Sequence, residues 1–255
     1  MWNLFNKKNK TDGEHHTLQL ITDKGMPFGY VEAYKALRTN LDFMAGSMDV
    51  HTLVITSTVP EESKSNVAVN LALTLAESGK KVALVDCDLR KPVLHRYLKA
   101  GHNVKGVSNV LSNQCTLDET LQELKEMNLT FLPAGTPPPN PSEMLSQPQM
   151  QAMVNTLREK FDVVIFDAPP VSVVTDAAVI GRYVDGAVFV VRSDYAPADA
   201  VRGAVKKLQD AGVRVLGSVL TRYDMKKALK GSSYAYSYAY NYNYAYEKQK
   251  ADVVE

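Results

Sequence analysis

Short runs of consecutive apolar residues recur along the chain and alternate with longer segments that have helical periodicity. The apolar runs are rich in β-branched residues and predict strands at residues 51–57, 81–86, 162–170, 186–192 and 213–220. Because these runs are continuously apolar rather than alternating, they suit parallel strands that are covered on both faces. The pattern therefore predicts a sheet buried between two layers of helices.

Two of the intervening segments carry clear signals for helix ends. The segment SNVAVNLALTLAESG ends at Gly79, while PADAVRGAVKKLQDAG opens with Pro197 and closes with Gly212. Glycine commonly ends a helix in the left-handed conformation, and proline is favoured at a helix start. Repeated alternation of strand and helix implies right-handed crossovers. We therefore expect an α/β fold with a doubly wound, mostly parallel sheet flanked by helices.

The two ends of the chain lack these patterns, which divides it into three regions. Residues 1–25 are polar and aperiodic, and we expect a flexible N-terminal arm. Residues 26–230 contain the strand–helix alternation and form one domain. In residues 231–255 tyrosines alternate with small polar residues, and we expect a disordered tail.

Composition narrows the class of protein further. The formal net charge of +1 gives no reason to expect a nucleic-acid partner. No apolar run approaches the roughly 20 residues of a membrane helix, and the first residues lack the apolar core of a signal peptide. Two cysteines provide no disulfide framework. These features predict a cytosolic protein.

Charged groups follow several of the predicted strands, at the sheet edge where ligands of such folds bind. After the first strand, a loop leads to Lys64 and Ser65 at the start of a helix. Free backbone N–H groups and the helix dipole favour a phosphate there. The lysine ammonium would reach the β- and γ-phosphates, and the serine hydroxyl would bind magnesium. Arg192 and Asp194 follow a later strand without an evident role.

Three aspartates follow two other strands. Asp86 and Asp88 lie two residues apart at a strand end, so they point to the same side while Cys87 points away. Asp167 ends the strand VVIFD, as in a Walker B motif. Each feature alone has a plain alternative, because aspartates after strands often cap helices. Together with Lys64 and Ser65, they predict a nucleotide site.

The loop expected to cradle the phosphates lacks the usual glycines. It comprises Pro60, Glu61, Glu62, Ser63, Lys64, Ser65 and Asn66. Glycine is favoured in such loops because some positions need a positive φ or have no room for a Cβ. A non-glycine residue at positive φ costs on the order of 1–2 kcal/mol, which the binding of Mg-triphosphate can offset. We expect Glu61 and Glu62 to point to solvent. We also expect the loop to bind phosphate somewhat less well than a glycine-rich loop but still to function.

These motifs resemble those of the bacterial tyrosine kinases, P-loop enzymes found with capsule and exopolysaccharide export systems. The resemblance runs from about Tyr30 to the tail. It is carried by a Walker A-like stretch at residues 57–65, by LVDCDLRKP at 84–92, which is similar to Walker A′, and by VVIFDAPPVSVVTDA at 163–177. It implies the P-loop NTPase fold and an ATP- and Mg²⁺-dependent protein-tyrosine kinase.

The resemblance also implies roles for single residues. Lys64 and Ser65 would bind the phosphates and magnesium, with Asp88 and Asp167 holding the metal directly or through water. Asp86 would be the base that orients the tyrosine hydroxyl.

The segment EAYKALRTNL is similar to a family segment that mediates ring assembly in relatives. Glu32 and Arg38 match the family pattern, while Lys35 replaces an arginine and loses its bidentate fork. The resemblance implies a homo-oligomeric ring, activated by the cytoplasmic tail of a separate membrane-anchored chain-length-determinant protein. It also implies a cognate protein-tyrosine phosphatase and a place at the inner face of the membrane through the partner.

The tail would then be the substrate. The expected sites of autophosphorylation are Tyr234, Tyr236, Tyr238, Tyr240, Tyr242, Tyr244 and Tyr246. An edge strand with one aromatic face is an alternative, but the other face offers only Ala, Ser and Asn. A sticky low-complexity tail is a second alternative. As a flexible chain, residues 231–246 would span roughly 20–24 Å, enough to reach a neighbouring subunit.

Two other functions compete with the autokinase. The altered phosphate-binding loop is compatible with a weakly active nucleotide-binding scaffold whose tyrosines are modified by another enzyme. ParA/MinD-like partition ATPases share the fold but carry a signature lysine five positions before the P-loop lysine. Val59 occupies that position here, and those ATPases lack a tyrosine-rich tail.

Overall fold

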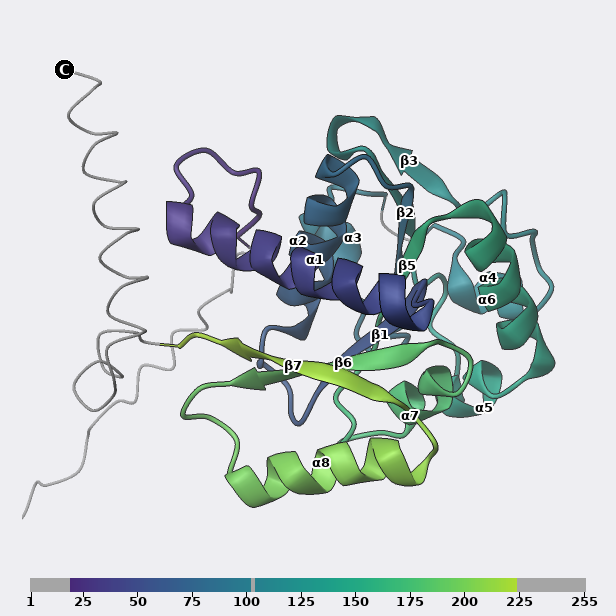
Figure 1. Ribbon diagram of the computed structural model, residues 1–255. Coiled ribbons are helices and arrows are strands. Elements are labelled where there is room, and N and C mark those ends of the chain that lie inside the picture. The colour runs from purple at the N-terminus through teal and green to yellow at the C-terminus, as the bar shows by residue number, and fades with distance from the viewer. Residues whose placement is uncertain (1–18, 102–103, 224–255) are drawn as a thin grey trace, which may run out of the picture.

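A seven-stranded sheet forms the centre of the molecule in the computed structural model, which describes residues 19–101 and 104–223 (Figure 1). Its strand order is β3-β4-β2-β5-β1-β6-β7, and all neighbouring pairs are parallel except β3 and β4. The strands are β1 (Thr52–Ser57), β2 (Val82–Asp86), β3 (Gln122–Leu124), β4 (Leu129–Leu132), β5 (Val163–Asp167), β6 (Gly186–Arg192) and β7 (Val215–Thr221).

All five predicted strands are confirmed, as β1, β2, β5, β6 and β7. The pattern did not predict β3 and β4, at the edge of the sheet. They have three and four residues, and the residues of β3 are only partly buried or exposed. Such short segments carry too few positions for an apolar run to stand out.

Helices cover both faces of this sheet (Figure 1). They are α1 (Phe28–Met48), α2 (Lys64–Glu77), α3 (Leu94–Tyr97), α4 (Val107–Leu111), α5 (Pro141–Leu145), α6 (Pro148–Lys160), α7 (Asp176–Gly181) and α8 (Ala198–Asp210), with a 3-10 turn at Lys125–Met127. One apolar core lies under α1, α2 and α3, and a second lies under α4 to α8. Leu53 and Ile55 of β1 enter the first core and Val54 enters the second, as a strand covered on both faces requires.

The predicted helix ends are confirmed. Helix α2 ends at Glu77, and Gly79 follows with a φ of +89°. Pro197 caps the start of α8, and Gly212 follows its end with a φ of +79°. Both glycines occupy the left-handed region that L-residues avoid.

The start of the chain departs from the prediction of a flexible arm over residues 1–25. Leu20 and Ile21 are buried in the first core, and the Ile21 N–H donates to Oδ1 of Asn70 in α2 at 2.8 Å. The Tyr30 hydroxyl donates to the carbonyl of Gln19 at 3.0 Å. This apolar pair anchors residues 19–25 against α2, because its burial removes apolar surface from water. The rest of the predicted arm lies outside the described residues.

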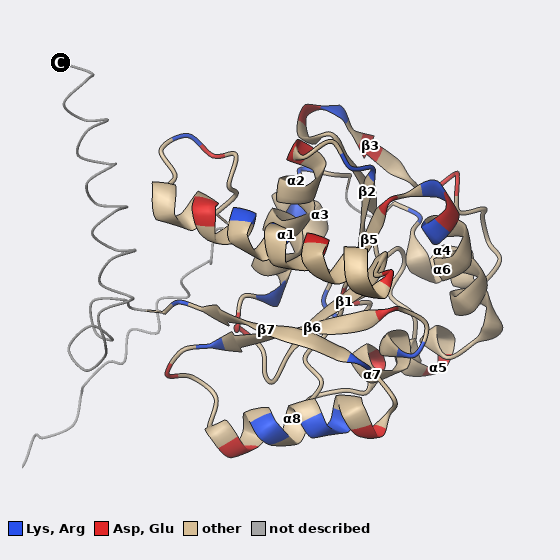
Figure 2. Cartoon of the chain, in the orientation of Figure 1, with Lys and Arg blue, Asp and Glu red and all other residues tan. Residues whose placement is uncertain are grey.

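Charge is spread over the outer surface rather than collected on one element. Acidic and basic positions are interspersed along α1 and α8 (Figure 2). This distribution accords with the small net charge. Within residues 19–101 and 104–223, no helix is long and apolar enough to cross a membrane. The predicted tyrosine tail, residues 231–255, lies outside the described residues.

Candidate active site

The loop between β1 and α2 has the backbone shape that usually requires glycine. Glu61 has a φ of 66° and Ser63 a φ of 70°, the two positions at which glycine was expected. Ser63 caps α2, which begins at Lys64. The loop thus has the left-handed backbone conformation at two positions that are not glycine, although glycine adopts this conformation at the lowest energetic cost.

Lys64 lies between two carboxylates that come from other strands. Its Nζ is 3.2 Å from Oδ1 of Asp167 and 3.3 Å from Oδ2 of Asp88. The Ser65 hydroxyl donates to Oδ2 of Asp167 at 2.6 Å. Parallel pairing explains the meeting, because Asp86 and Asp167 are register partners at the ends of β2 and β5. The predicted groups therefore do converge at one corner of the sheet.

Burial and mutual charge shift the protonation of these groups. Burial alone would lower the pKa of Lys64, but the charges of Asp167, Asp88 and Asp86 outweigh it and raise that pKa. Burial raises the pKa of Asp167, although Lys64 and the Ser65 hydroxyl oppose this shift. Burial and the neighbouring Asp167 raise the pKa of Asp86 well above its usual value. The raised pKa of Lys64 favours its charged form, and the raised pKa of Asp86 makes its carboxylate a better proton acceptor than an exposed aspartate.

Asp86 and Asp88 also shape the loop that follows β2. The two carboxylate oxygens of Asp86 accept hydrogen bonds from the N–H groups of Asp88 and Leu94, both at 3.2 Å. Asp88 accepts from the N–H of Lys91 at 3.0 Å. Cys87, between the two aspartates, is buried in the second core on the opposite side, as the spacing predicted.

The prediction for the two loop glutamates is half wrong. Glu61 is exposed, as expected, but Glu62 is only 1% exposed and does not point to solvent. Its carboxylate finds backbone N–H donors inside the protein, at Val59 and Arg192. These two hydrogen bonds replace those that the carboxylate would make with water. The sequence alone did not indicate such donors.

Sequence reasoning missed a second polar cluster beside this corner. Asp176, the first residue of α7, is fully buried and accepts from Nε of Arg90 at 3.0 Å. The Arg90 guanidinium also donates to Oγ of Ser142 in α5 at 2.9 Å, and Ser142 donates to Asp176. The cluster joins the loop after β2 to helices α5 and α7. Arg90 and Asp176 both lie within the motifs LVDCDLRKP and VVIFDAPPVSVVTDA, which was the available signal.

The donor set at the corner fits magnesium. Among the described residues, no three His, Cys, Asp or Glu side chains form a ready metal site. Magnesium does not need one, because it takes one or two carboxylates and completes its shell with phosphate and water. Asp88, Asp167 and the Ser65 hydroxyl provide that partial set.

The residues expected at a subunit interface lie on α1. Lys35 pairs with Glu32 on the same helix at 2.7 Å, and both side chains remain partly exposed. Arg38 instead donates to the carbonyl of Thr74 in α2 at 2.9 Å. Glu32 and Lys35 thus pair with each other at a partly exposed position, while Arg38 helps to join α1 to α2.

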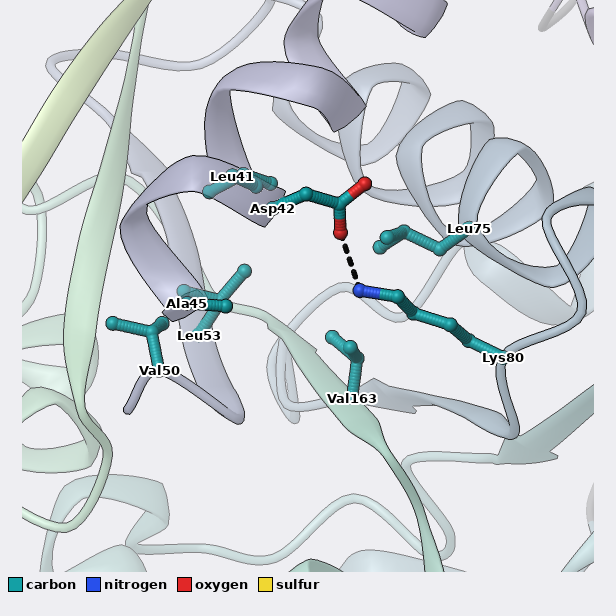
Figure 3. Close-up of a pocket in the computed structure, with 8 residues that line it drawn as sticks. All are labelled: Leu41, Asp42, Ala45, Val50, Leu53, Leu75, Lys80 and Val163. Carbon is teal, nitrogen blue, oxygen red and sulfur yellow. Dashed lines mark hydrogen bonds and ion pairs between the residues drawn. The ribbon is translucent and has the colours of Figure 1, made fainter. Parts of the chain in front are cut away.

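A small pocket lies at the opposite end of the sheet (Figure 3). The Asp42–Lys80 ion pair lies among the side chains that line it. Leu53 and Val163, near the first residues of β1 and β5, place it away from the strand ends that carry the aspartates. Its lining consists of Leu41, Asp42, Ala45, Val50, Leu53, Leu75, Lys80 and Val163.

Comparison with known proteins gives consistent results. Residues 62–196 match the model of an AAA domain family. Tyrosine-protein kinase YwqD of Bacillus subtilis is 36% identical over 80% of this chain and 84% of its own length. Tyrosine-protein kinase CpsD of Streptococcus agalactiae is 33% identical over 78% of this chain and 86% of its own length.

Solved structures show the same relationship. The kinase domain of Escherichia coli tyrosine kinase ETK superposes with a TM-score of 0.73 at 34% identity, covering 75% of this chain and 74% of that domain. The septum site-determining protein MinD of Pyrococcus horikoshii, solved with Mg-ADP, has a TM-score of 0.59 at 23% identity and covers 68% of this chain and 70% of its own. The second likeness shows the fold alone.

Proposed function

Because this chain belongs to the family of tyrosine-protein kinases, and is itself an enzyme of that class, we propose that it phosphorylates the tyrosine cluster of its own C-terminal tail. The observation that carries the proposal is the position of Lys64 between Asp88 and Asp167, beside Ser65. A cation, two carboxylates and a hydroxyl at a helix N-terminus are the groups that phosphoryl transfer from Mg-ATP requires.

Each residue of the corner has a task in this reaction. Lys64 contributes a cation for the β- and γ-phosphates, and its raised pKa keeps it charged. Ser65, Asp88 and Asp167 would hold magnesium, which neutralises charge on the phosphates when bound. Residues 60–66 would supply the backbone N–H groups that surround the phosphates.

Asp86 would handle the proton. As the tyrosine oxygen bonds to the γ-phosphorus, the bond from phosphorus to the β-γ bridging oxygen breaks and ADP leaves. The hydroxyl proton passes to Asp86, whose raised pKa makes its carboxylate a better acceptor than an exposed aspartate. A phenol has a pKa of about 10, so the reaction needs an oriented acceptor rather than a strong base.

The wider role follows from the resemblance and the tail. Seven closely spaced tyrosines raise the local concentration of acceptor hydroxyls near a subunit's site. We assign Glu32, Lys35 and Arg38 to ring assembly on the basis of the family segment that they match. A membrane-anchored activator would bring the kinase to the inner face of the membrane. There it would regulate capsular or exopolysaccharide synthesis and export, and a phosphatase would reverse the modification.

Incubation of the purified protein with labelled ATP and Mg²⁺ tests the proposal. Wild type should incorporate label into the tail, while Lys64→Met, Asp86→Ala and a variant with Phe at the seven tail tyrosines should not. The assay is run with and without the membrane activator. Labelling of wild type no greater than that of Lys64→Met under both conditions would refute the autokinase.

The weakly active scaffold is the second candidate, favoured by the two positive φ values in the loop. It predicts nucleotide binding without label transfer in the same assay. A MinD-like ATPase predicts ATP hydrolysis without phosphotyrosine. Val59, in place of that family's signature lysine, supports the kinase over this third reading.

A further inference from the structure

Glu62 has a buried carboxylate in the middle of the phosphate-binding loop, and the reaction described above gives this side chain no task. Its Oε2 accepts from the Val59 N–H at 2.8 Å, and its Oε1 accepts from the Arg192 N–H at 3.3 Å. Among the described residues, no lysine, arginine or histidine side chain forms a salt bridge with it. Backbone donors therefore hold this anion, one from its own loop and one from the end of β6.

The main chain at the same place is held by residues at the ends of β7 and β6. The Thr221 hydroxyl, at the end of β7, donates to the carbonyl of Glu62 at 3.0 Å. The Arg192 guanidinium lies 4.3 Å from the ring centroid of Tyr195 and donates to the carbonyl of Glu61 at 3.4 Å. Glu62 thus fastens the loop to the ends of β6 and β7 through both its side chain and its backbone.

The residues on either side of Glu62 are the two in the left-handed conformation. A loop with L-residues at positive φ tends to relax to negative φ unless its surroundings fix it. Hydrogen bonds at the residue between Glu61 and Ser63 oppose relaxation at both positions. The Glu62 carboxylate also lies in the loop that is proposed to bind the phosphates of the nucleotide, and it should repel them. Its stabilisation of the loop must therefore outweigh this repulsion if Glu62 favours binding.

We propose that Glu62 is a positioning residue that holds this glycine-poor loop in its phosphate-binding shape before nucleotide arrives. The inference rests on the proposed function, since it assumes that the loop binds a nucleotide. It explains how a loop without the usual glycines keeps their conformation. It also makes a definite prediction. If glycine replaces Glu61 and Ser63, the strain of the positive φ angles is removed, and nucleotide affinity should depend less on Glu62.

A double-mutant cycle tests this dependence. The dissociation constant for a fluorescent Mg-ADP analogue is measured for wild type, Glu62→Gln, the glycine loop Glu61→Gly/Ser63→Gly, and the triple variant. Glutamine keeps the size of Glu62 but can accept only one of the two N–H groups well. We expect Glu62→Gln to weaken binding about tenfold in the native loop and by less than about threefold in the glycine loop. The maximal rate of label transfer at saturating ATP should change less than the affinity does.

Two further variants keep the test decisive. Glu119 accepts the N–H of Thr116 at 2.8 Å with the same three-residue spacing, in an exposed turn, so Glu119→Gln should leave the affinity unchanged. Thr221→Val removes the hydroxyl that holds the Glu62 carbonyl, and it should weaken binding several-fold in the native loop only. This variant replaces Glu62→Gln in the cycle if the latter does not fold.

The outcomes separate the two proposals. If wild type does not bind the analogue, the proposed nucleotide site is wrong. If wild type binds but Glu62→Gln weakens both loops equally, the carboxylate is an ordinary structural group and the inference is refuted. Tighter binding by Glu62→Gln would also refute it, because repulsion of phosphate would then be the dominant effect.

Discussion

Replacement of Lys64 by methionine would test the electrostatics of the corner in the protein without ligand. The ammonium is 3.2 Å and 3.3 Å from two carboxylates, and no more than 12% of any of the three side chains is exposed. At an effective dielectric constant of about 20, each pair gains roughly 5 kcal/mol. Desolvation of a buried ion offsets several kcal/mol of this gain. We therefore expect Lys64→Met to lower the free energy of unfolding by about 3–5 kcal/mol near neutral pH.

The loss should depend on pH in a definite direction. Burial already raises the pKa of Asp167, and removal of Lys64 takes away the charge that opposes this shift. A carboxyl group whose folded pKa lies above its unfolded pKa binds more protons in the folded state. Its contribution to stability therefore falls as pH rises from the unfolded pKa through the folded pKa. The destabilisation by Lys64→Met should accordingly be larger at pH 8 than at pH 5.

Urea unfolding followed by circular dichroism at both pH values measures these differences. Lys80→Met is the matched control, because Lys80 also pairs with an aspartate, Asp42, but at a surface where the two side chains are 31% and 40% exposed (Figure 3). That pair should contribute no more than about 1 kcal/mol. If Lys64→Met costs no more than Lys80→Met at pH 8, the corner is not held together by this cation and the reasoning is wrong.

Three other substitutions test the site and the fold. Asp86→Asn should lower the rate of phosphoryl transfer by about 10²- to 10⁴-fold. Burial and Asp167 raise the pKa of Asp86, so wild type loses stability as this carboxyl ionises above about pH 4, and the asparagine variant does not. The stability of Asp86→Asn relative to wild type should therefore increase with pH. Parallel pH profiles in urea unfolding would contradict this. Gly106→Ala would place a Cβ 2.0 Å from the carbonyl oxygen of Pro133, so we expect a loss of about 3 kcal/mol or more in thermal unfolding. Gly203→Ala, where a Cβ meets nothing within 4 Å, should instead stabilise α8 by about 0.5–1 kcal/mol, and equal melting temperatures for the two variants would contradict the packing argument.

The sequence predicted the central part of the fold because continuous apolar runs are an unambiguous signal there. Strands such as β5 are buried along their whole length, so every residue contributes to the pattern. The antiparallel strand β3 gives no such signal, because its three residues are partly buried or exposed. Leu20 and Ile21 form an anchor too short to show any periodicity, so the pattern of apolar positions does not separate them from the polar residues around them.

The contacts of the candidate site also fall into those that the sequence indicates and those that it does not. The meeting of Lys64 with Asp88 and Asp167 follows from strand order and parallel pairing, which alternation along the sequence can indicate. The burial of Glu62 depends on donors from Val59 and from Arg192, 130 residues away along the chain, and no local pattern reports such a contact. The roles assigned to the site residues stay predictions until the kinase and binding assays are done.

The direction of β7 decides at which end of the sheet the chain continues after Thr221. Because β7 runs parallel to β6, the chain leaves the sheet at Thr221 on the same edge as Asp86 and Asp167. An antiparallel last strand of seven residues would have released the chain roughly 23 Å away, at the far edge. If the tail is the substrate, as proposed, this strand direction starts it at the end of the sheet that carries Lys64 and the aspartates.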